Sequence, residues 1–270
     1  MSTNLIPLQD ADLQRFAPSV FTDHALPGVS DRYQFVRTSD VLNTMRDVGY
    51  IPVQAGQARS RTEDGRVYTR HVVKMTHKDN LKPKADRRVG DVIPQIVLTN
   101  SHNRTSSFQL MAGLYRLVCS NGMVTSAGEF ANVRVLHNDP EIHAHIIDGT
   151  NLIRELTESV VTPQVSRMLE LELADSTIRE FAEAATFLKF GDVRPDHVEH
   201  FLNVRREADE GRSLWAVLNR VQENAVRGGY TVRDAAGRNV TQRGIGSITR
   251  DADFNVNLWQ LGAKVLELAD

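Results

Sequence analysis

The stretch from Asn100 to Met123, NSHNRTSSFQLMAGLYRLVCSNGM, begins with polar residues and continues with an apolar run. In the apolar part, bulky side chains recur every three or four residues, which predicts a helix. Thr105 or Ser106 can cap its start, and Asn121-Gly122 can supply a left-handed stop. Ile93 to Thr99 precedes it as a predicted strand, so the unit is strand, polar loop and helix. The buried helix face would carry Leu110, Met111, Leu114, Leu117 and Val118.

A strand pair is predicted upstream of this unit. Ile51 to Arg61 alternates in character and Arg66 to His77 is rich in β-branched residues, which are features of strands. Asp64-Gly65 lies between them, and glycine tolerates the positive φ of a tight hairpin turn. Ser30 to Gly49 has apolar residues at helical spacing and is predicted as a helix. Lys78 to Asp91 contains proline and mixed charge, and is predicted as an exposed loop.

Helices predominate in the second half of the chain. Asn151 to Phe190 is predicted to be helical, divided in two at Pro163 because proline lacks the backbone N–H. The further predicted elements are a strand at 130–137, a helix at 213–227 ended by Gly228-Gly229, a hairpin at 230–248 and a helix at 255–269.

The fold class that follows is α+β. We expect an antiparallel sheet with a basic β-hairpin in the N-terminal half, packed by helices, and a mostly helical C-terminal half with a second hairpin. We divide the chain into an N-terminal extension at 1–29, an α+β core at 30–150 and a mostly helical part at 151–270, packed on the core.

Composition indicates an ordinary folded protein. Apolar residues make up 41% and charged residues 24% of the 270 residues, which excludes wholesale disorder and collagen-like structure. The single Cys119 cannot form an internal disulfide, so a reducing compartment fits best. No basic and apolar leader is visible, nor any run of about 18 apolar residues. We therefore expect a cytoplasmic protein of a bacterial cell, away from membranes.

The formal net charge of −2 conceals a segregation of charge along the chain. From Arg59 to Arg116, twelve Lys and Arg stand against five acids, a net charge of +7. From His137 to Glu210, seven bases stand against sixteen acids, a net charge of −9. From Arg212 to Arg250, seven Arg stand against two acids, a net charge of +5. Two basic zones thus flank an acidic one, and the first basic zone favours an anionic partner.

The predicted basic hairpin is the first candidate site. If both strands are regular, alternate residues project from one face, which could follow a phosphate backbone. Tyr68 would then be available to stack on a base. The alternative is a solvated sheet face on which Lys and Arg maintain solubility. The residues of this face are Arg59, Arg61, Arg66, Tyr68, Arg70 and Lys74.

The polar loop is the second candidate site. Ser101, His102 and Arg104 gather donors where a strand leads into the predicted helix, whose N-terminus favours an anion. Arg116, off the apolar helix face, could point toward the same phosphate. The alternative is that the serines are turn formers and caps and that His102 is a structural hydrogen-bond partner.

We assign no catalytic residue, no metal and no cofactor. His143 and His145 would share a face of an extended segment with His137 nearby, but no cysteine accompanies them. Asp139, Glu141 and Asp148 lack the spacing expected of two-metal nucleases. Whether the protein is an enzyme stays open, and the sequence leans against it.

Four motifs together resemble the prophage and plasmid proteins of domain-of-unknown-function family nine-three-two (DUF932). They are SDRYQFVRTSDVL, GYIPVQAGQARSR, IPQIVLTNSHNRTSSFQLMAGLYRLVCSNGM and LWAVLNRVQENAVRGG, and they span most of the chain. The commoner family form has Asp-Gly where this sequence has Asn103-Arg104. The arrangement of a helix, Gly49-Tyr50, a basic hairpin, a strand and a helix is also similar to Rad-fifty-two-like single-strand annealing proteins.

These observations lead to a functional expectation. The protein is expected to serve a mobile element by binding single-stranded DNA through the Arg59 to Arg104 region, in recombination or replication. A ring-like homo-oligomer that anneals strands is one arrangement. A different class of function is open: an interaction protein that binds a host defence protein, with an acidic zone that imitates DNA. A metal-dependent nuclease is the less favoured third alternative.

Overall fold

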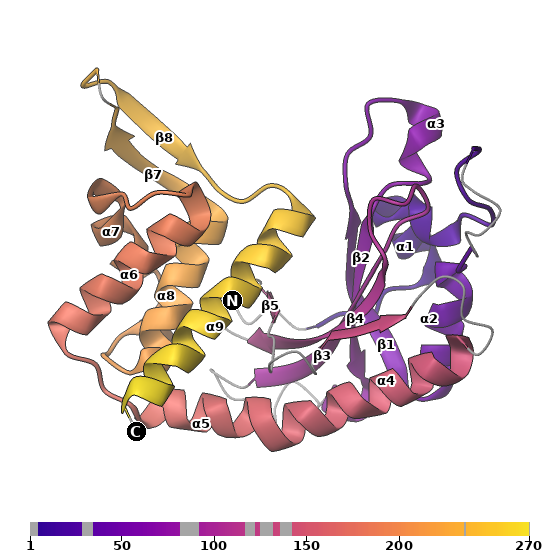
Figure 1. Ribbon diagram of the computed structural model, residues 1–270, viewed down its shortest axis with the longest axis horizontal. Helices are drawn as coiled ribbons and strands as arrows, with labels where there is room; N and C mark the ends of the chain where they lie inside the picture. Colours follow the sequence, from indigo (N-terminus) through magenta and orange to yellow (C-terminus); the bar gives the residue numbers. More distant parts are fainter. Residues whose placement is uncertain are drawn as a thin grey trace.

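The computed structural model describes residues 5–28, 35–81, 92–116, 122–124, 132–135, 142–234 and 236–269. Figure 1 shows a sheet half and a helical half joined along one side by a long helix. The helices are α1 Asp10–Phe16, α2 Thr38–Asp47, α3 Glu63–Arg66, α4 Ile142–Leu156, α5 Thr162–Glu170, α6 Asp175–Phe190, α7 Pro195–Leu202, α8 Leu214–Arg227 and α9 Ile248–Ala269. The strands are β1 Tyr50–Gln57, β2 His71–His77, β3 Val92–Asn100, β4 Phe108–Arg116, β5 Gly122–Val124, β6 Asn132–Val135, β7 Gly228–Arg233 and β8 Asn239–Arg243.

The predicted fold class, α+β, is confirmed. In the N-terminal half, β1, β2, β3 and β4 form an antiparallel sheet in sequence order, and the short strands β5 and β6 both pair with β4. The C-terminal half is mostly helical, and β7 and β8 form the second hairpin around residues 236–237. Ser213 caps α8 by accepting from the Ala216 backbone N–H, and Gly228 ends that helix.

Both faces of the sheet are covered. On one face, Val73, Ile96 and Phe108 pack with Leu13 of α1 and Met45 of α2. The N-terminal segment that contains α1 is therefore part of this core. On the other face, α9 packs through Ala252 and Val256 against apolar residues of three strands, Val72, Val97 and Met111. A second core, which contains Trp215 and Trp259, lies among α5 to α9.

The predicted helix after the polar loop is wrong, because residues 108–116 form β4. Phe108, Leu110 and Ala112 pack toward α1 and α2, whereas Met111 packs toward α9. A strand buried on both faces has no polar side to reveal a two-residue period. Its continuous apolar run therefore imitates the spacing of a buried helix. Residues 117–121, where the helix stop was placed, lie outside the described residues.

The predicted basic hairpin exists only in part. β1 and β2 pair with Gln57 opposite His71, so the connection from residue 58 to residue 70 is a long loop. Asp64-Gly65 lies in the single helical turn α3, and the Thr62 side chain accepts from the Gly65 N–H. This cap takes the place of the tight turn, and glycine fits there because a Cβ on Gly65 would lie 2.7 Å from the Ser60 Oγ. Arg59, Arg61 and Arg66 consequently belong to a loop and not to strands.

Other predicted helix boundaries also differ, and α4 and α9 begin at Ile142 and Ile248, earlier than the predicted 151 and 255. α2 begins at Thr38, while residues 29–34 lie outside the described residues. Pro163 does not divide the helix: α4 continues through a π-helical turn, Thr157–Val161, into α5, where Pro163 occupies the first turn. The wider turn accommodates a residue that cannot donate to the helix. Among the described residues, no helix is both long and apolar enough to cross a membrane.

Candidate nucleic-acid interface

The basic loops of the first zone meet at one end of the sheet. His71 at the start of β2 pairs with Asn100 at the end of β3, so the 58–70 loop and the 101–107 loop adjoin. The His102 N–H donates to the Tyr68 carbonyl at 3.1 Å and joins the two loops. Four arginines of these loops, Arg59, Arg61, Arg66 and Arg104, are exposed. We call this set the sheet-end arginines.

Two members of the predicted basic hairpin are in fact buried. Tyr68 is only 9% exposed, and its hydroxyl lies 2.6 Å from the His24 Nε2, so its ring is not a stacking platform. Lys74 is 8% exposed and lies on the sheet face that α9 covers. The alternation argument fails because regular strand geometry begins only at His71. Arg70 is half-buried at the end of the loop.

Lys74 instead acts on α9. Burial raises the pKa of the Asp251 carboxyl, and the Lys74 ammonium opposes that rise. Asn255 donates to Asp251 Oδ1 at 3.2 Å, and its own Oδ1 accepts from Gln222 at 2.9 Å. A polar network therefore connects the sheet to α8 and α9.

Replacing Lys74 with methionine is expected to make folding stability fall more steeply as pH rises. The pKa of Asp251 in the folded protein already exceeds its unfolded value, so ionisation of this carboxyl opposes folding above the unfolded value. Without Lys74 that pKa rises further and the penalty grows. Urea unfolding at pH 4 and pH 8 measures the effect, because the penalty begins at the unfolded value of 3.8. The double variant Lys74→Met with Asp251→Asn should recover stability at pH 8, and equal pH dependence in the wild type and Lys74→Met would contradict the assignment.

The signature loop is held by its own buried side chains. Ser101 Oγ accepts from the Ser106 N–H at 2.8 Å and donates to the Ser106 carbonyl at 3.0 Å, which closes the loop. The His102 Nε2 lies 2.9 Å from the Ser19 carbonyl. Ser101 and His102 are fully buried, so neither offers a donor to an external phosphate. Of the three residues predicted here, Arg104 alone is exposed, at the loop tip with a left-handed φ of 65°.

The predicted anion site at a helix N-terminus is wrong, because the loop leads into β4 and not into a helix. Arg116 closes that strand, and its side chain lies outside the described residues. Among the described residues, no group of three or more His, Cys, Asp or Glu is placed to hold a metal. His137 and the His143 side chain lie outside those residues.

Sequence reasoning missed the buried network that supports both loops. The His71 Nδ1 lies 2.9 Å from the Ser19 hydroxyl, and its Nε2 lies 2.9 Å from the Thr38 hydroxyl. Asn100 donates to the same Thr38 Oγ1 at 3.0 Å. Burial, with a smaller effect from His102, lowers the pKa of His71 to about 3. A neutral histidine thus ties β2, α2 and the N-terminal segment together behind the sheet-end arginines.

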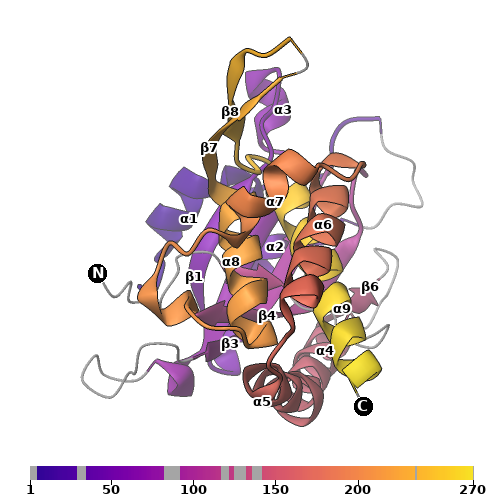
Figure 2. The same ribbon diagram turned by 90° about the vertical axis from the view of Figure 1, so that its left-hand side faces the viewer.

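The second basic zone forms a separate projection. Figures 1 and 2 both show the β7–β8 hairpin and the α3 loop extending toward the same end of the molecule. Along the long axis they are separated, and the start of α9 lies between them (Figure 1). Arg233, Arg238 and Arg243 are exposed on this hairpin, and Arg238 pairs with Asp234 at 2.7 Å. The α3 loop and the β7–β8 hairpin therefore project separately, and they border one end of the protein.

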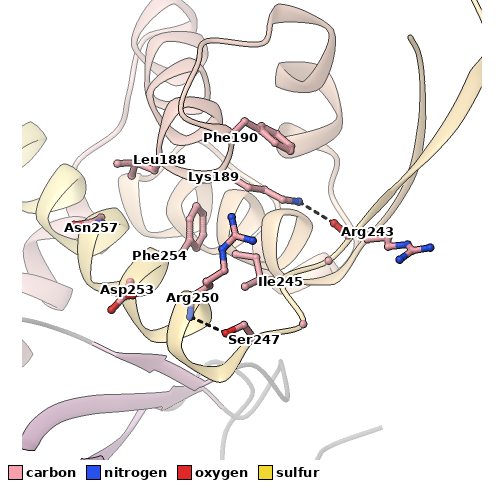
Figure 3. Close-up of a pocket in the computed structure, with 12 residues that line it drawn as sticks. Leu188, Lys189, Phe190, Arg243, Ile245, Ser247, Arg250, Asp253, Phe254 and Asn257 are labelled. Atoms are coloured by element: carbon pink, nitrogen blue, oxygen red, sulfur yellow. Dashed lines mark hydrogen bonds between the residues drawn. The ribbon is translucent and has the colours of Figure 1, made fainter. Parts of the chain in front are cut away.

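A cavity of about 390 Å³ lies at the base of this hairpin (Figure 3). Lys189 Nζ at its wall donates to the Ala225 carbonyl at 2.9 Å and the Arg243 carbonyl at 3.4 Å. Burial lowers the pKa of Lys189 to about 8. Gly244 must lack a side chain, because a Cβ would overlap the Val226 carbonyl. The glycines at 244 and 246, between a strand and a helix, are the sequence signal that could have revealed this cavity.

A smaller cavity of about 220 Å³ lies at the end of the sheet opposite the sheet-end arginines, between β1 to β3 and the π-helical turn. Tyr50, His77, Arg154 and Glu158 line it. The Tyr50 and His77 rings meet edge to face with centroids 5.3 Å apart. Gly49 is required beside them, because its φ is 92° and a Cβ would lie 2.6 Å from the His77 Nε2.

Comparison with known proteins agrees with the sequence motifs. The chain is similar to the Escherichia coli (strain K12) proteins "UPF0380 protein YfjQ" and "UPF0380 protein YafZ". Each is 31% identical over 261 residues, which is 96% of this chain and 92% of the relative. No solved structure matches, and the likeness to Rad-fifty-two-like proteins is not supported. A family model described as "Domain of unknown function (DUF932)" matches residues 25–257, and the chain belongs to that family.

Proposed function

We propose that this protein binds nucleic acid, single-stranded DNA first, at the end of the molecule bordered by its two basic projections. The observation that supports this proposal is the exposure of the sheet-end arginines together with Arg233 and Arg243 at one end of a chain whose net charge is −2. Arginine forms charge-assisted hydrogen bonds with phosphate oxygens, often in pairs. Recombination or replication of a mobile element, strand annealing included, is the process we propose for it.

The proposed contacts are to the sugar-phosphate backbone. Because Tyr68 is buried, the sheet-end loops offer guanidinium groups and no aromatic stacking surface from that residue. Backbone contacts position a strand but carry little sequence information. We therefore expect binding that is strongly salt-dependent and weakly sequence-dependent.

A quadruple variant of the sheet-end arginines tests the interface. Arg59→Ala, Arg61→Ala and Arg66→Ala remove exposed charges, and Arg104→Gly removes a charge at a positive φ that glycine adopts without strain. Each lost phosphate contact should reduce the slope of log affinity against log salt by about 0.7 for single strands. Fluorescence anisotropy with labelled single-stranded DNA, duplex DNA and RNA at several salt concentrations measures the slope.

A matched control is Arg167→Ala, an exposed arginine on α5 at the opposite end of the molecule (Figure 1). This variant should bind as the wild type does. The proposal fails if the wild type shows no salt-sensitive binding to any of the three nucleic acids at micromolar protein. An unchanged slope in the quadruple variant would place the interface elsewhere and reject the site.

A further inference from the structure

We infer that the cavity at the base of the β7–β8 hairpin binds a nucleoside monophosphate, either as the free nucleotide or as the 5′-phosphorylated end of a strand. The strand-end form rests on the proposed function, whereas the free-nucleotide form does not. No sequence motif or relative assigns a ligand to this cavity. The inference stands on its size, its cationic groups and its apolar floor.

The size suits a small organic ligand. Pockets that bind small molecules enclose about 300 to 1,000 Å³ and combine apolar walls with a few placed polar groups. At about 390 Å³, this cavity lies near the lower end of that range. It is formed by two segments that are distant in sequence: the end of α6, and the β8–α9 connection with the first turns of α9.

Cationic side chains line the cavity. Lys189 has three N–H donors, of which the Ala225 and Arg243 carbonyls accept two, and its ammonium lies 5.0 Å from the Phe190 ring centroid. In Figure 3 the Arg250 guanidinium rises between Phe254 and Lys189, whereas the Asp253 carboxylate points away from it. The Arg243 guanidinium extends away from the other lining residues (Figure 3). A phosphate between Lys189 and Arg250 would meet two positive charges.

The rest of the lining suits a base. Leu188, Ile245 and Phe254 provide an apolar surface next to the cations, and Asn257 carries an amide that can donate and accept at a base edge. Inorganic phosphate alone would leave this apolar part uncovered. A planar aromatic group attached to a phosphate matches both halves of the lining.

Gly246 provides a way to block the cavity without disturbing the fold. No heavy atom lies within 4 Å of a Cβ built on Gly246, and its φ does not fall in the left-handed region. Gly246 lines the cavity, so Gly246→Leu is expected to narrow it with a side chain while the backbone stays unstrained. Arg250→Ala removes one cation from an exposed position. Arg238→Ala, at the hairpin tip and 79% exposed, removes an equal charge outside the cavity and serves as the control.

Isothermal titration calorimetry with deoxyadenosine monophosphate, deoxyadenosine and inorganic phosphate tests the inference. We expect saturable one-to-one binding of the nucleotide, and binding of deoxyadenosine and phosphate about tenfold weaker or more, because charged hydrogen bonds and apolar contact each contribute. Arg250→Ala should weaken nucleotide binding about tenfold. Gly246→Leu should abolish it, and Arg238→Ala should leave it unchanged.

The pH dependence adds a second readout. His197 of α7 and Tyr230 of β7 lie near Lys189, and Arg194 lies over the neighbouring Phe190 ring. The charged residues of the cavity lining besides Lys189 are Arg243, Arg250 and Asp253. The arginines keep their charge at neutral pH. Lys189 loses its proton near pH 8, so nucleotide affinity should fall between pH 7 and pH 9. Thermal unfolding of each variant verifies that it folds.

Each outcome decides between the ligands. Absence of heat with the nucleotide at millimolar concentration, or unchanged affinity in Gly246→Leu and Arg250→Ala, overturns the inference. Tighter binding of a 5′-phosphorylated strand than of a 5′-hydroxyl strand, lost in Gly246→Leu, supports the strand-end form. Equal binding of the two strands, with nucleotide binding intact, supports the free nucleotide. Nucleotide binding without any strand binding supports this inference and rejects the proposed function.

Discussion

His71→Gln is expected to flatten the loss of folding stability below pH 6.5. His71 is completely buried, and burial lowers its pKa from 6.5 to about 3. The unfolded chain therefore takes up a proton near pH 6.5 that the folded protein refuses until about pH 3. Stability from the neutral ring is complete above pH 6.5 and is lost as pH falls toward 3, by about 1.4 kcal/mol for each pH unit. Glutamine offers a donor and an acceptor but does not titrate.

Urea unfolding at pH 7 and pH 5 measures this effect in the wild type and in His71→Gln. The wild type should lose about 2 kcal/mol more than the variant over that interval. Thr38→Val is the matched control, because it removes the hydroxyl next to the His71 Nε2 and leaves the titrating ring in place. It should lower stability by about 1 to 2 kcal/mol at both pH values. Parallel pH dependence in the wild type and His71→Gln would show that His71 is not the group responsible.

Gly228→Ala is expected to cause a large loss of stability through a single methyl group. Gly228 ends α8 with φ 61°, a conformation that costs an L residue about 1 to 3 kcal/mol. Its Cβ would also lie 2.5 Å from the Gly244 nitrogen and 2.7 Å from the Gln242 carbonyl oxygen. These are backbone atoms that cannot rotate aside, so overpacking adds about 1 to 3 kcal/mol.

Gly229→Ala separates the two causes. Gly229 has φ 80° but no atom within 4 Å of its Cβ position, so alanine there meets strain without a clash. Thermal unfolding followed by tryptophan fluorescence measures both variants, because Trp215 and Trp259 lie in the adjoining core. Gly228→Ala should lower the midpoint clearly more than Gly229→Ala. Equal shifts would mean that the backbones of residues 228 and 244 do not pack as closely as described.

The sequence predicted the elements whose signals are local. α8 was predicted from its apolar spacing, its Ser213 cap and its glycine stop, all of which lie within the segment. The prediction of a helix in place of β4 was wrong because this segment is buried on both faces, through Leu110 on one and Met111 on the other. The residues that bury it are distant in sequence. Arg59 and Arg61 lie in a loop because the connection between β1 and β2 is long. The Asp64-Gly65 turn motif did not reveal that length.

The positive charge of the candidate site was predicted from the sequence. The buried hydrogen bonds that hold its loops were not. The exposed arginines came from a count of charges along the chain, which needs no fold. The roles of His71, Ser19 and Asn100 could not be derived, because the hydrogen bonds join segments separated by 52 and 62 residues. The cavity beside Lys189 was missed for the same reason, since α6 and α9 bring its walls together only in the folded protein.

The continuous helix from Ile142 to Glu170 connects the two halves of the protein that carry the basic projections. Its first part packs in the sheet core through Ile146 and Ile153, and its last part packs in the helical core through Val165 and Met168. The two cores therefore share one continuous helix at this junction. A nucleic-acid strand bound by both projections would have to span the distance between them, and a strand of another shape would have to bend to reach both.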